Sequence, residues 1–122
     1  MASEPTQDDK TQIGTSTLAK ELMGSSPMKD YFSLQQDAIK FAIAVALANN
    51  LDPVVDEPSI VNSQHTASLD EDRSLKFLLE NYKRSQTPYR LAEQLAEAGF
   101  RFIRKSLDEH VLFEDLFESS LS

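Results

Sequence analysis

One stretch of the chain restricts the fold more than any other: residues 33–50, SLQQDAIKFAIAVALANN. Its second half alternates large apolar residues with alanines, and this alternation suits a buried strand as well as a buried helix. The alanines favour the helix, because alanine is the strongest helix former and is depleted in strands. Ser33 and Gln36 have the spacing of a capping box at the N-terminus of a helix, and Asn50 is a suitable C-terminal residue for it. We therefore expect a helix over residues 33–50.

This helix carries large side chains on two opposed faces. On a helical wheel, one side carries Ile39, Ile43 and Leu47, and nearly the opposite side carries Leu34, Phe41 and Val45. A helix of this kind has to be covered from both sides. The pattern therefore predicts the central element of a helical bundle.

The second expected helix covers residues 69–84, with Ser68 or Asp70 as its cap. Phe77 lies off the main apolar stripe, so it is either exposed or covered by the N-terminal segment or a second subunit. The stripe itself is narrow, which is typical of a helix with one buried face, and consists of Leu75, Leu78, Leu79 and Tyr82.

The third helix is predicted over residues 88–107. Thr87 and Pro88 suit the N-cap and the first helical position. Apolar residues cover about half of the circumference, which indicates contact with two neighbours. Gly99 lies within this region, and a glycine inside a helix costs about 1 kcal/mol relative to alanine. We therefore expect another helix to approach closely at Gly99.

Two segments outside these helices are less regular. Residues 1–30 are acidic and poor in large apolar groups, so we expect a mostly disordered leader. Within it, the residues between Ser16 and Gly24 are compatible with a short helix. Residues 51–68 contain two β-branched pairs, which suit either a short two-stranded ribbon or an extended loop: Val54–Val55 and Ile60–Val61.

The end of the chain, residues 108–118, alternates carboxylates with large apolar groups. One interpretation is a fourth helix that packs its apolar side on the domain. The other is a linear motif that inserts this side into a groove of another protein. The apolar side consists of Leu112, Phe113, Leu116 and Phe117.

Composition limits the remaining choices. The chain has 122 residues, enough for one domain, which we place at residues 31–122 and which includes the acidic C-terminal helix or tail. It has no cysteine, which excludes disulfides and thiolate chemistry and fits a cytoplasmic protein. Its longest apolar run, residues 41–48, is shorter than the roughly 20 residues that a membrane span needs. The net charge of −8 disfavours nonspecific binding to nucleic acid.

Motifs for chemistry are missing from the sequence. The two histidines are not at metal-ligand spacing, and the three glycines form no phosphate-binding loop. We therefore expect no enzyme activity, no metal, no cofactor and no small-molecule substrate. A DNA-binding helix is the alternative to a solvated, salt-bridged face, but Glu93 and Glu97 interrupt its basic residues, which are Arg90, Arg101, Arg104 and Lys105.

Two patterns also carry a resemblance to a known family. Residues 30–48, DYFSLQQDAIKFAIAVALA, contain an aromatic residue, a serine, an acidic residue four positions on and then a Phe- and Ala-containing helix. The later Glu- and Ala-rich helix ends in AEAGFRFI. The chain thus resembles small accessory proteins encoded beside bacterial DNA phosphorothioation defence systems. This resemblance implies an accessory or regulatory role in defence rather than a catalytic one.

The resemblance assigns no functional residue. The family's loop after its first helix tends to be basic, whereas this chain has Asp52, Asp56 and Glu57 there. The resemblance therefore implies no DNA contact at this loop.

Together the patterns predict an all-α fold, a compact bundle of three main helices with a C-terminal amphipathic helix. Apolar faces left over from the bundle indicate a non-enzymatic protein–protein interaction module, which oligomerises or serves a bacterial complex as an accessory subunit. A DNA-binding regulator is the alternative, and an acidic mimic of nucleic acid is a weaker one. The expected partner-binding residues are Phe77, Leu112, Phe113, Leu116 and Phe117.

Overall fold

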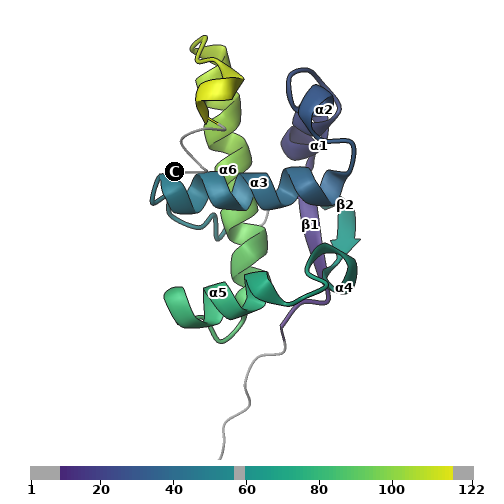
Figure 1. Cartoon of the computed structure of the whole chain (residues 1–122), viewed down its shortest axis with the longest axis vertical. Helices are drawn as coiled ribbons and strands as arrows, with labels where there is room; N and C mark the ends of the chain where they lie inside the picture. Colours follow the sequence, from purple (N-terminus) through teal and green to yellow (C-terminus); the bar gives the residue numbers. More distant parts are fainter. Residues whose placement is uncertain (1–8, 57–59, 117–122) are drawn as a thin grey trace, which may run out of the picture.

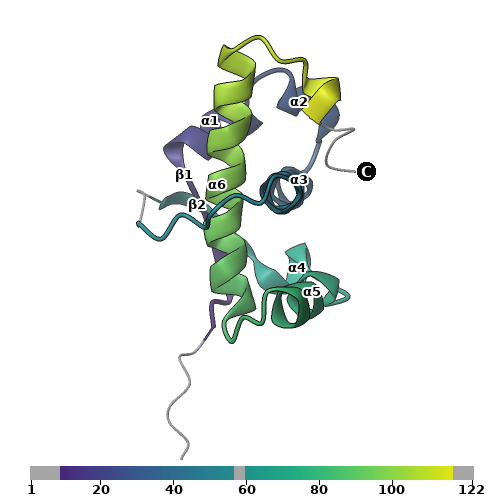
Figure 2. The same ribbon diagram turned by 90° about the vertical axis from the view of Figure 1, so that its left-hand side faces the viewer.

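The computed structural model describes residues 9–56 and 60–116. In chain order the elements are β1 (Gln12–Ser16), α1 (Thr17–Met23), α2 (Met28–Tyr31), α3 (Gln35–Ala48), β2 (Ile60–His65), α4 (Thr66–Leu69), α5 (Ser74–Tyr82) and α6 (Pro88–Asp108). Helix α6 runs along the length of the molecule, and α3 lies across it (Figure 1). The turned view places α6 between two layers, with the strands and α1 on one side and α3, α4 and α5 on the other (Figure 2).

Helices α3 and α6 approach closely at Gly99. A Cβ atom on Gly99 would overlap the backbone carbonyl of Ala42, so a larger residue does not fit there. This confirms the close helix approach expected from a glycine inside residues 88–107. Most side chains of the two predicted faces of α3 lie in the core, namely Ile39, Ile43, Phe41 and Val45, and Leu47 packs partly buried against it. Leu34 is the exception, because it stands at the N-cap and is 53% exposed.

An aromatic cluster covers one face of α3. The ring of Phe41 lies 5.3 Å from that of Phe32 and 5.3 Å from that of Phe113, measured between centroids. Phe113 begins a helical turn over residues 113–116 that folds back beside α3. The end of the described chain therefore completes the core around the central helix.

The helix predicted from residue 108 onward does not start there, because the chain reverses after α6. His110 has a positive φ of 66°. The Val111 N–H donates to the Ser106 carbonyl at 2.9 Å, and the His110 N–H donates to the Leu107 carbonyl at 3.0 Å. These two bonds form a Schellman motif, which ends the helix and turns the chain.

The prediction of an all-α fold is wrong, because β1 and β2 form a two-stranded antiparallel sheet. Gln12 pairs with His65 at one end and Ser16 with Ile60 at the other, with an irregularity after Thr15. Residues 51–68, for which the sequence left a local ribbon and an extended loop open, contain one strand, β2. Its partner instead comes from the leader, about 50 residues earlier in the chain.

Composition assigned the leader to disorder, but residues 9–30 contain β1, α1 and most of α2. They place Ile13, Leu22 and Met28 in the core. Helix α1 begins after Ser16, whose hydroxyl accepts the Ala19 N–H, and ends before Gly24. The segment is ordered although it has few large side chains, because each of these side chains is buried and so contributes its full hydrophobic stabilisation. Residues 1–8 of the leader lie outside the described residues.

Two helix starts also differ from the expected ones. The residue at the N-cap of α3 is Leu34, and no side chain caps the helix, so the expected capping box of Ser33 and Gln36 does not form. Helix α5 begins at Ser74 instead of residue 69, because Arg73 adopts a left-handed conformation that interrupts the helix. Within the described residues, no helix combines the length and the apolar character needed to cross a lipid bilayer.

Candidate functional site

Helix α5 is fixed to the domain at its N-terminal end. The buried carboxylate of Asp70 accepts the N–H groups of Leu75 at 2.9 Å and Lys76 at 3.0 Å. It also accepts the hydroxyl of Tyr89, from α6, at 2.8 Å. Burial and this hydrogen bond raise the pKa of Tyr89 to about 12. One carboxylate thus caps α5 and joins it to α6.

Beyond this attachment, α5 sends one large side chain into the core. Leu79 is fully buried. The predicted buried stripe is wrong for Leu78, which is 42% exposed, and for Tyr82, which is 68% exposed, whereas Leu75 is half-buried and packs against the core. The helix meets the domain with a narrow strip around Leu75 and Leu79, since no element within residues 9–56 and 60–116 covers its outer side.

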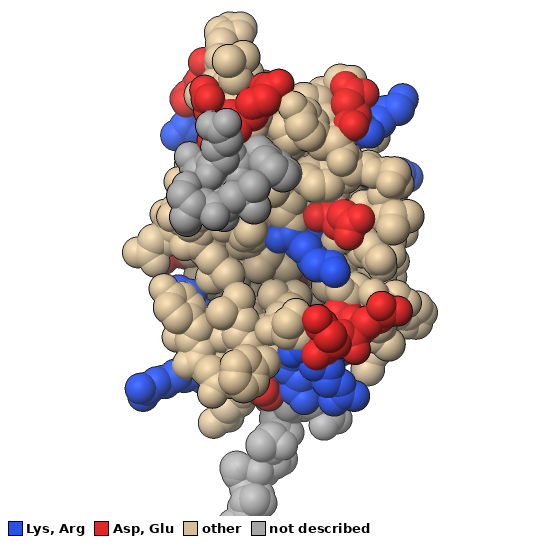
Figure 3. All heavy atoms as spheres, in the orientation of Figure 1, with Lys and Arg blue, Asp and Glu red and all other residues tan. Residues whose placement is uncertain are grey.

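We call the outer apolar surface, formed by Leu75, Phe77, Leu78 and Tyr82, the α5 face. Phe77 has 67% of its surface exposed. Together with Lys40 from α3, these side chains line a hollow of about 690 Å³. The surface around α5 is mostly uncharged, with charged side chains toward its edges (Figure 3). The structure therefore presents an open apolar surface at the first of the predicted partner-binding residues.

The other predicted partner-binding residues do not share one surface. Phe113 is 3% exposed and Leu116 is buried, so for these two the prediction of partner contact is wrong and a core role replaces it. Leu112 points outward with 64% of its surface exposed. Phe117 lies outside the described residues. The aromatic cluster on α3 accounts for the burial, since it needs Phe113 as a member.

The predicted basic residues of α6 are separated by carboxylates. Arg101 is exposed and pairs with Glu97 at 3.0 Å through its Nε atom. Arg90 lines a pocket more than two turns away from Arg101, Arg104 and Lys105. The structure therefore does not bring the four bases into one continuous stripe.

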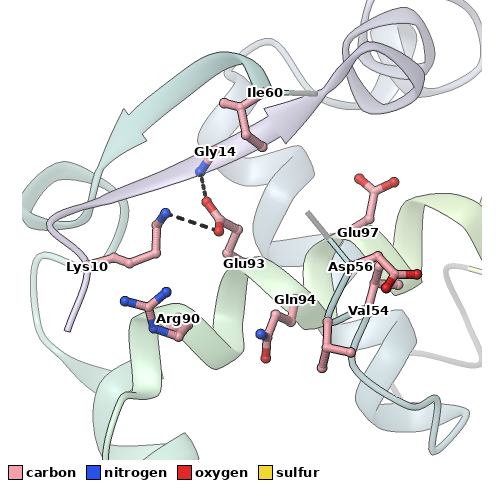
Figure 4. Close-up of a pocket in the computed structure, with 10 residues that line it drawn as sticks. Lys10, Gly14, Val54, Asp56, Ile60, Arg90, Glu93, Gln94 and Glu97 are labelled. Atoms are coloured by element: carbon pink, nitrogen blue, oxygen red, sulfur yellow. Dashed lines mark hydrogen bonds and ion pairs between the residues drawn. The ribbon is translucent and has the colours of Figure 1, made fainter. Parts of the chain in front are cut away.

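That pocket, the β1–α6 pocket, is a second candidate site that sequence reasoning missed. It lies where β1 and residues 54–56 meet α6, and it has a volume of about 150 Å³. Figure 4 shows Lys10 and Arg90 together at one side and Val54, Asp56 and Glu97 at the other. The Val54 N–H donates to the Gln94 carbonyl at 3.1 Å, which fastens residues 54–56 to α6.

Two carboxylates of α6 hold β1 in place beside this pocket. Glu93 accepts the Gly14 N–H at 2.6 Å and lies 3.2 Å from the Lys10 ammonium (Figure 4). Glu97 is buried and accepts the Ser16 hydroxyl at 2.8 Å. In the sequence, Glu93 and Glu97 interrupt a basic face, and Glu97 also stands four residues before Arg101, its ion-pair partner in the structure, but neither has an evident role toward β1. No local signal could assign these roles, because their partners are about 80 residues away.

The N-terminus of α6 shows the same arrangement. The carboxylate of Asp9 accepts the N–H groups of Tyr89 at 2.8 Å and Arg90 at 2.9 Å. Thr87 occupies the N-cap position as predicted, but its side chain makes no capping bond. The Asp9 side chain therefore caps α6 in place of Thr87, although Asp9 lies near the other end of the chain.

The chemistry of the described residues is limited. Among them, no three His, Cys, Asp or Glu side chains are grouped so that they could hold a metal ion. Comparison with known proteins adds no family: no family model matches the chain, and no curated protein or solved structure is significantly similar to it.

Proposed function

We propose that this protein is a non-enzymatic protein–protein interaction module of the cytoplasm and that the α5 face is its contact surface. The observation behind the proposal is that Phe77 and Tyr82 are both about two-thirds exposed on one helix. Exposed aromatic residues that form a patch with neighbouring leucines are typical of interfaces, where aromatic side chains are enriched. The resemblance to defence-associated accessory proteins extends the proposal to an accessory or regulatory subunit of a bacterial DNA-modification complex.

The size of the α5 face indicates what kind of partner it fits. An aromatic side chain that is two-thirds exposed leaves on the order of 100–170 Å² open to water. Two such rings with parts of two leucines supply about half of the roughly 800 Å² that each partner contributes to a standard interface. The face therefore fits an apolar helix of a partner or the centre of a larger contact, including a contact with a second copy of this chain.

The proposal is tested with variants that change the α5 face without touching the core. The double variant Phe77→Ser with Tyr82→Ser removes both exposed rings, and Leu112→Ser removes an exposed apolar side chain elsewhere as the matched control. Because all three residues are exposed, circular dichroism should show unchanged folding for both variants. Sedimentation measures self-association, and affinity capture from native lysate followed by mass spectrometry measures partner binding.

We expect the wild type and Leu112→Ser to retain the same partner or the same oligomer, and the double variant to lose it. Two results would contradict the proposal. One is a strictly monomeric wild type that captures no protein above background. The other is a double variant that binds as well as the wild type.

A further inference from the structure

The β1–α6 pocket contains a cationic side chain, Arg90, that has no bonded partner among the described residues. Arg90 extends from α6 into the lining of the pocket, and its Nε atom is buried without a hydrogen-bond partner. Among the described residues, no hydrogen bond or ion pair reaches the Arg90 guanidinium. A buried donor with no acceptor is rare in folded proteins, and an acceptor that enters from outside would satisfy it.

Three carboxylates line the pocket; Glu93 and Glu97 are already occupied, and Asp56 lies on the other side of the pocket from Arg90 (Figure 4). Glu93 accepts a backbone N–H from Gly14 at 2.6 Å and has the Lys10 ammonium at 3.2 Å. Glu97 accepts the Ser16 hydroxyl and pairs with Arg101. Moving either carboxylate to Arg90 would break the bonds that hold β1 to α6. The free guanidinium is therefore available for a ligand.

The size and walls of the pocket define the rest of the ligand. Val54, Val55 and Ile60 supply apolar surface. The volume of about 150 Å³ is close to that of a known engineered cavity that binds benzene, so a body of about six heavy atoms fits. Asp56 and Glu97 lie across the pocket from Arg90, and they disfavour a second negative charge on the ligand (Figure 4).

We propose that the β1–α6 pocket binds a small monocarboxylate with a branched apolar body, whose carboxylate is held by the Arg90 guanidinium and whose alkyl group contacts Val54 and Ile60. A planar guanidinium matches a carboxylate in geometry as well as in charge. The strand β1, which borders this site, lies on the opposite side of α6 from α5 (Figure 2), and the site shares no lining residue with the hollow at the α5 face. It is therefore independent of the proposed contact surface.

The probe that fits is isobutyrate, which has six heavy atoms, and its neutral counterpart of the same shape is isobutyramide. The chain has three glycines, and only Gly14 lines the pocket. Protein labelled with ¹⁵N-glycine thus gives three amide signals, of which one reports on the site. We expect isobutyrate to move the Gly14 signal with a dissociation constant on the order of 1 mM, and to leave Gly24 and Gly99 in place.

Two variants test the role of Arg90. Arg90→Gln keeps a side chain of similar polarity but removes the charge, and we expect it to weaken isobutyrate binding by at least about tenfold. Arg104→Gln removes a charge from the same helix outside the pocket and is expected to change binding less than about twofold. Thermal melting and the unchanged positions of Gly24 and Gly99 check that both variants are folded.

Three results would overturn the proposal. They are a Gly14 signal that does not move at tens of millimolar isobutyrate, equal binding of isobutyramide, and unchanged binding by Arg90→Gln. Binding that is lost in Arg90→Gln and kept in Arg104→Gln supports it.

Discussion

The junction of α3 with α6 and the outer face of α5 use the same kinds of side chains in opposite ways. At the junction, Gly99 lets two backbones meet, and the large residues on both sides of α3 are buried. On α5, the aromatic residues Phe77 and Tyr82 remain open to water, while Leu79 is fully buried and Leu75 packs partly buried against the core. The comparison teaches that an apolar stripe at helical spacing identifies a helix but does not tell whether the domain itself covers that stripe.

The largest effect is expected at the junction. Gly99→Ala places a methyl group against the Ala42 carbonyl, so the helices must separate. We expect a loss of about 3 kcal/mol in the free energy of unfolding, measured with urea. In the control Gly24→Ala, the nearest atom to the new Cβ is the Lys20 carbonyl oxygen at 3.4 Å, and the change should stay within about 0.5 kcal/mol. If the two variants were equally stable, the claim that the backbones of α3 and α6 meet closely at Gly99 would be contradicted.

The comparison can be repeated inside α5 itself. Leu79→Ala removes the one fully buried side chain of this helix, and we expect a loss of about 2.5 kcal/mol in unfolding free energy. Phe77→Ala, two positions earlier, should cost less than about 0.5 kcal/mol because its ring is exposed. If Phe77→Ala were the more damaging of the two, the α5 face would be part of the core.

The link between α5 and α6 predicts a pH dependence. Tyr89 has a folded-state pKa of about 12, raised from an ordinary value of 10.0. The neutral form is favoured by folding, so its stabilising effect is complete below pH 10 and is lost as the pH rises to 12. After solvent screening we expect this loss to be about 1.5 kcal/mol. Urea unfolding of the wild type and of Tyr89→Phe, which cannot ionise, measures this loss. The difference in unfolding free energy between the two proteins should shrink as the pH rises toward 12.

A smaller effect is expected where the leader caps α6. Asp9→Ala leaves the N–H groups of Tyr89 and Arg90 without their acceptor and should cost about 1 kcal/mol. Asp52→Ala is the matched control, because this exposed carboxylate caps no helix. Thermal unfolding that shows the same stability for both variants would mean that Asp9 is not a working cap.

The smallest effect is a gain in stability. His110 has a φ of 66°, a conformation that glycine adopts without strain, so His110→Gly should stabilise the protein by about 0.5 kcal/mol. The adjacent Glu109 has a φ of −91°, and Glu109→Gly should lose several tenths of a kcal/mol. Differential scanning calorimetry compares the two, and a gain for Glu109→Gly would contradict the explanation.

Local patterns predicted the parts of the fold that depend on neighbours in the chain. Helices α3 and α6 lie where alanine content and the Thr87–Pro88 start place them. The close approach at Gly99 follows from the cost of glycine in a helix. Strand β1 was missed, since of its five residues only Ile13 is large and apolar, and short polar side chains fill the other inward positions.

The candidate sites show the same limit. Phe77 could be singled out from the sequence because it lies off its helical stripe. The β1–α6 pocket could not, since Lys10, Val54 and Arg90 come from three distant segments that only the folded chain brings together. For Phe113 the sequence left a core role and a partner contact open, because an amphipathic pattern does not say which apolar surface it meets; in the structure its ring lies in the core.

The distant pairing of β1 also has a consequence for synthesis of the protein. As the chain leaves the ribosome, Ser16 appears 81 residues before the Glu97 that receives its hydroxyl. At the usual 5–20 residues per second this is a delay of roughly 4–16 s. During that time β1 can pair with β2 but lacks its contacts with α6, so the early segment is more open to chaperones and proteases. The native surroundings of the first quarter of the chain are therefore complete only after translation of the last quarter has begun.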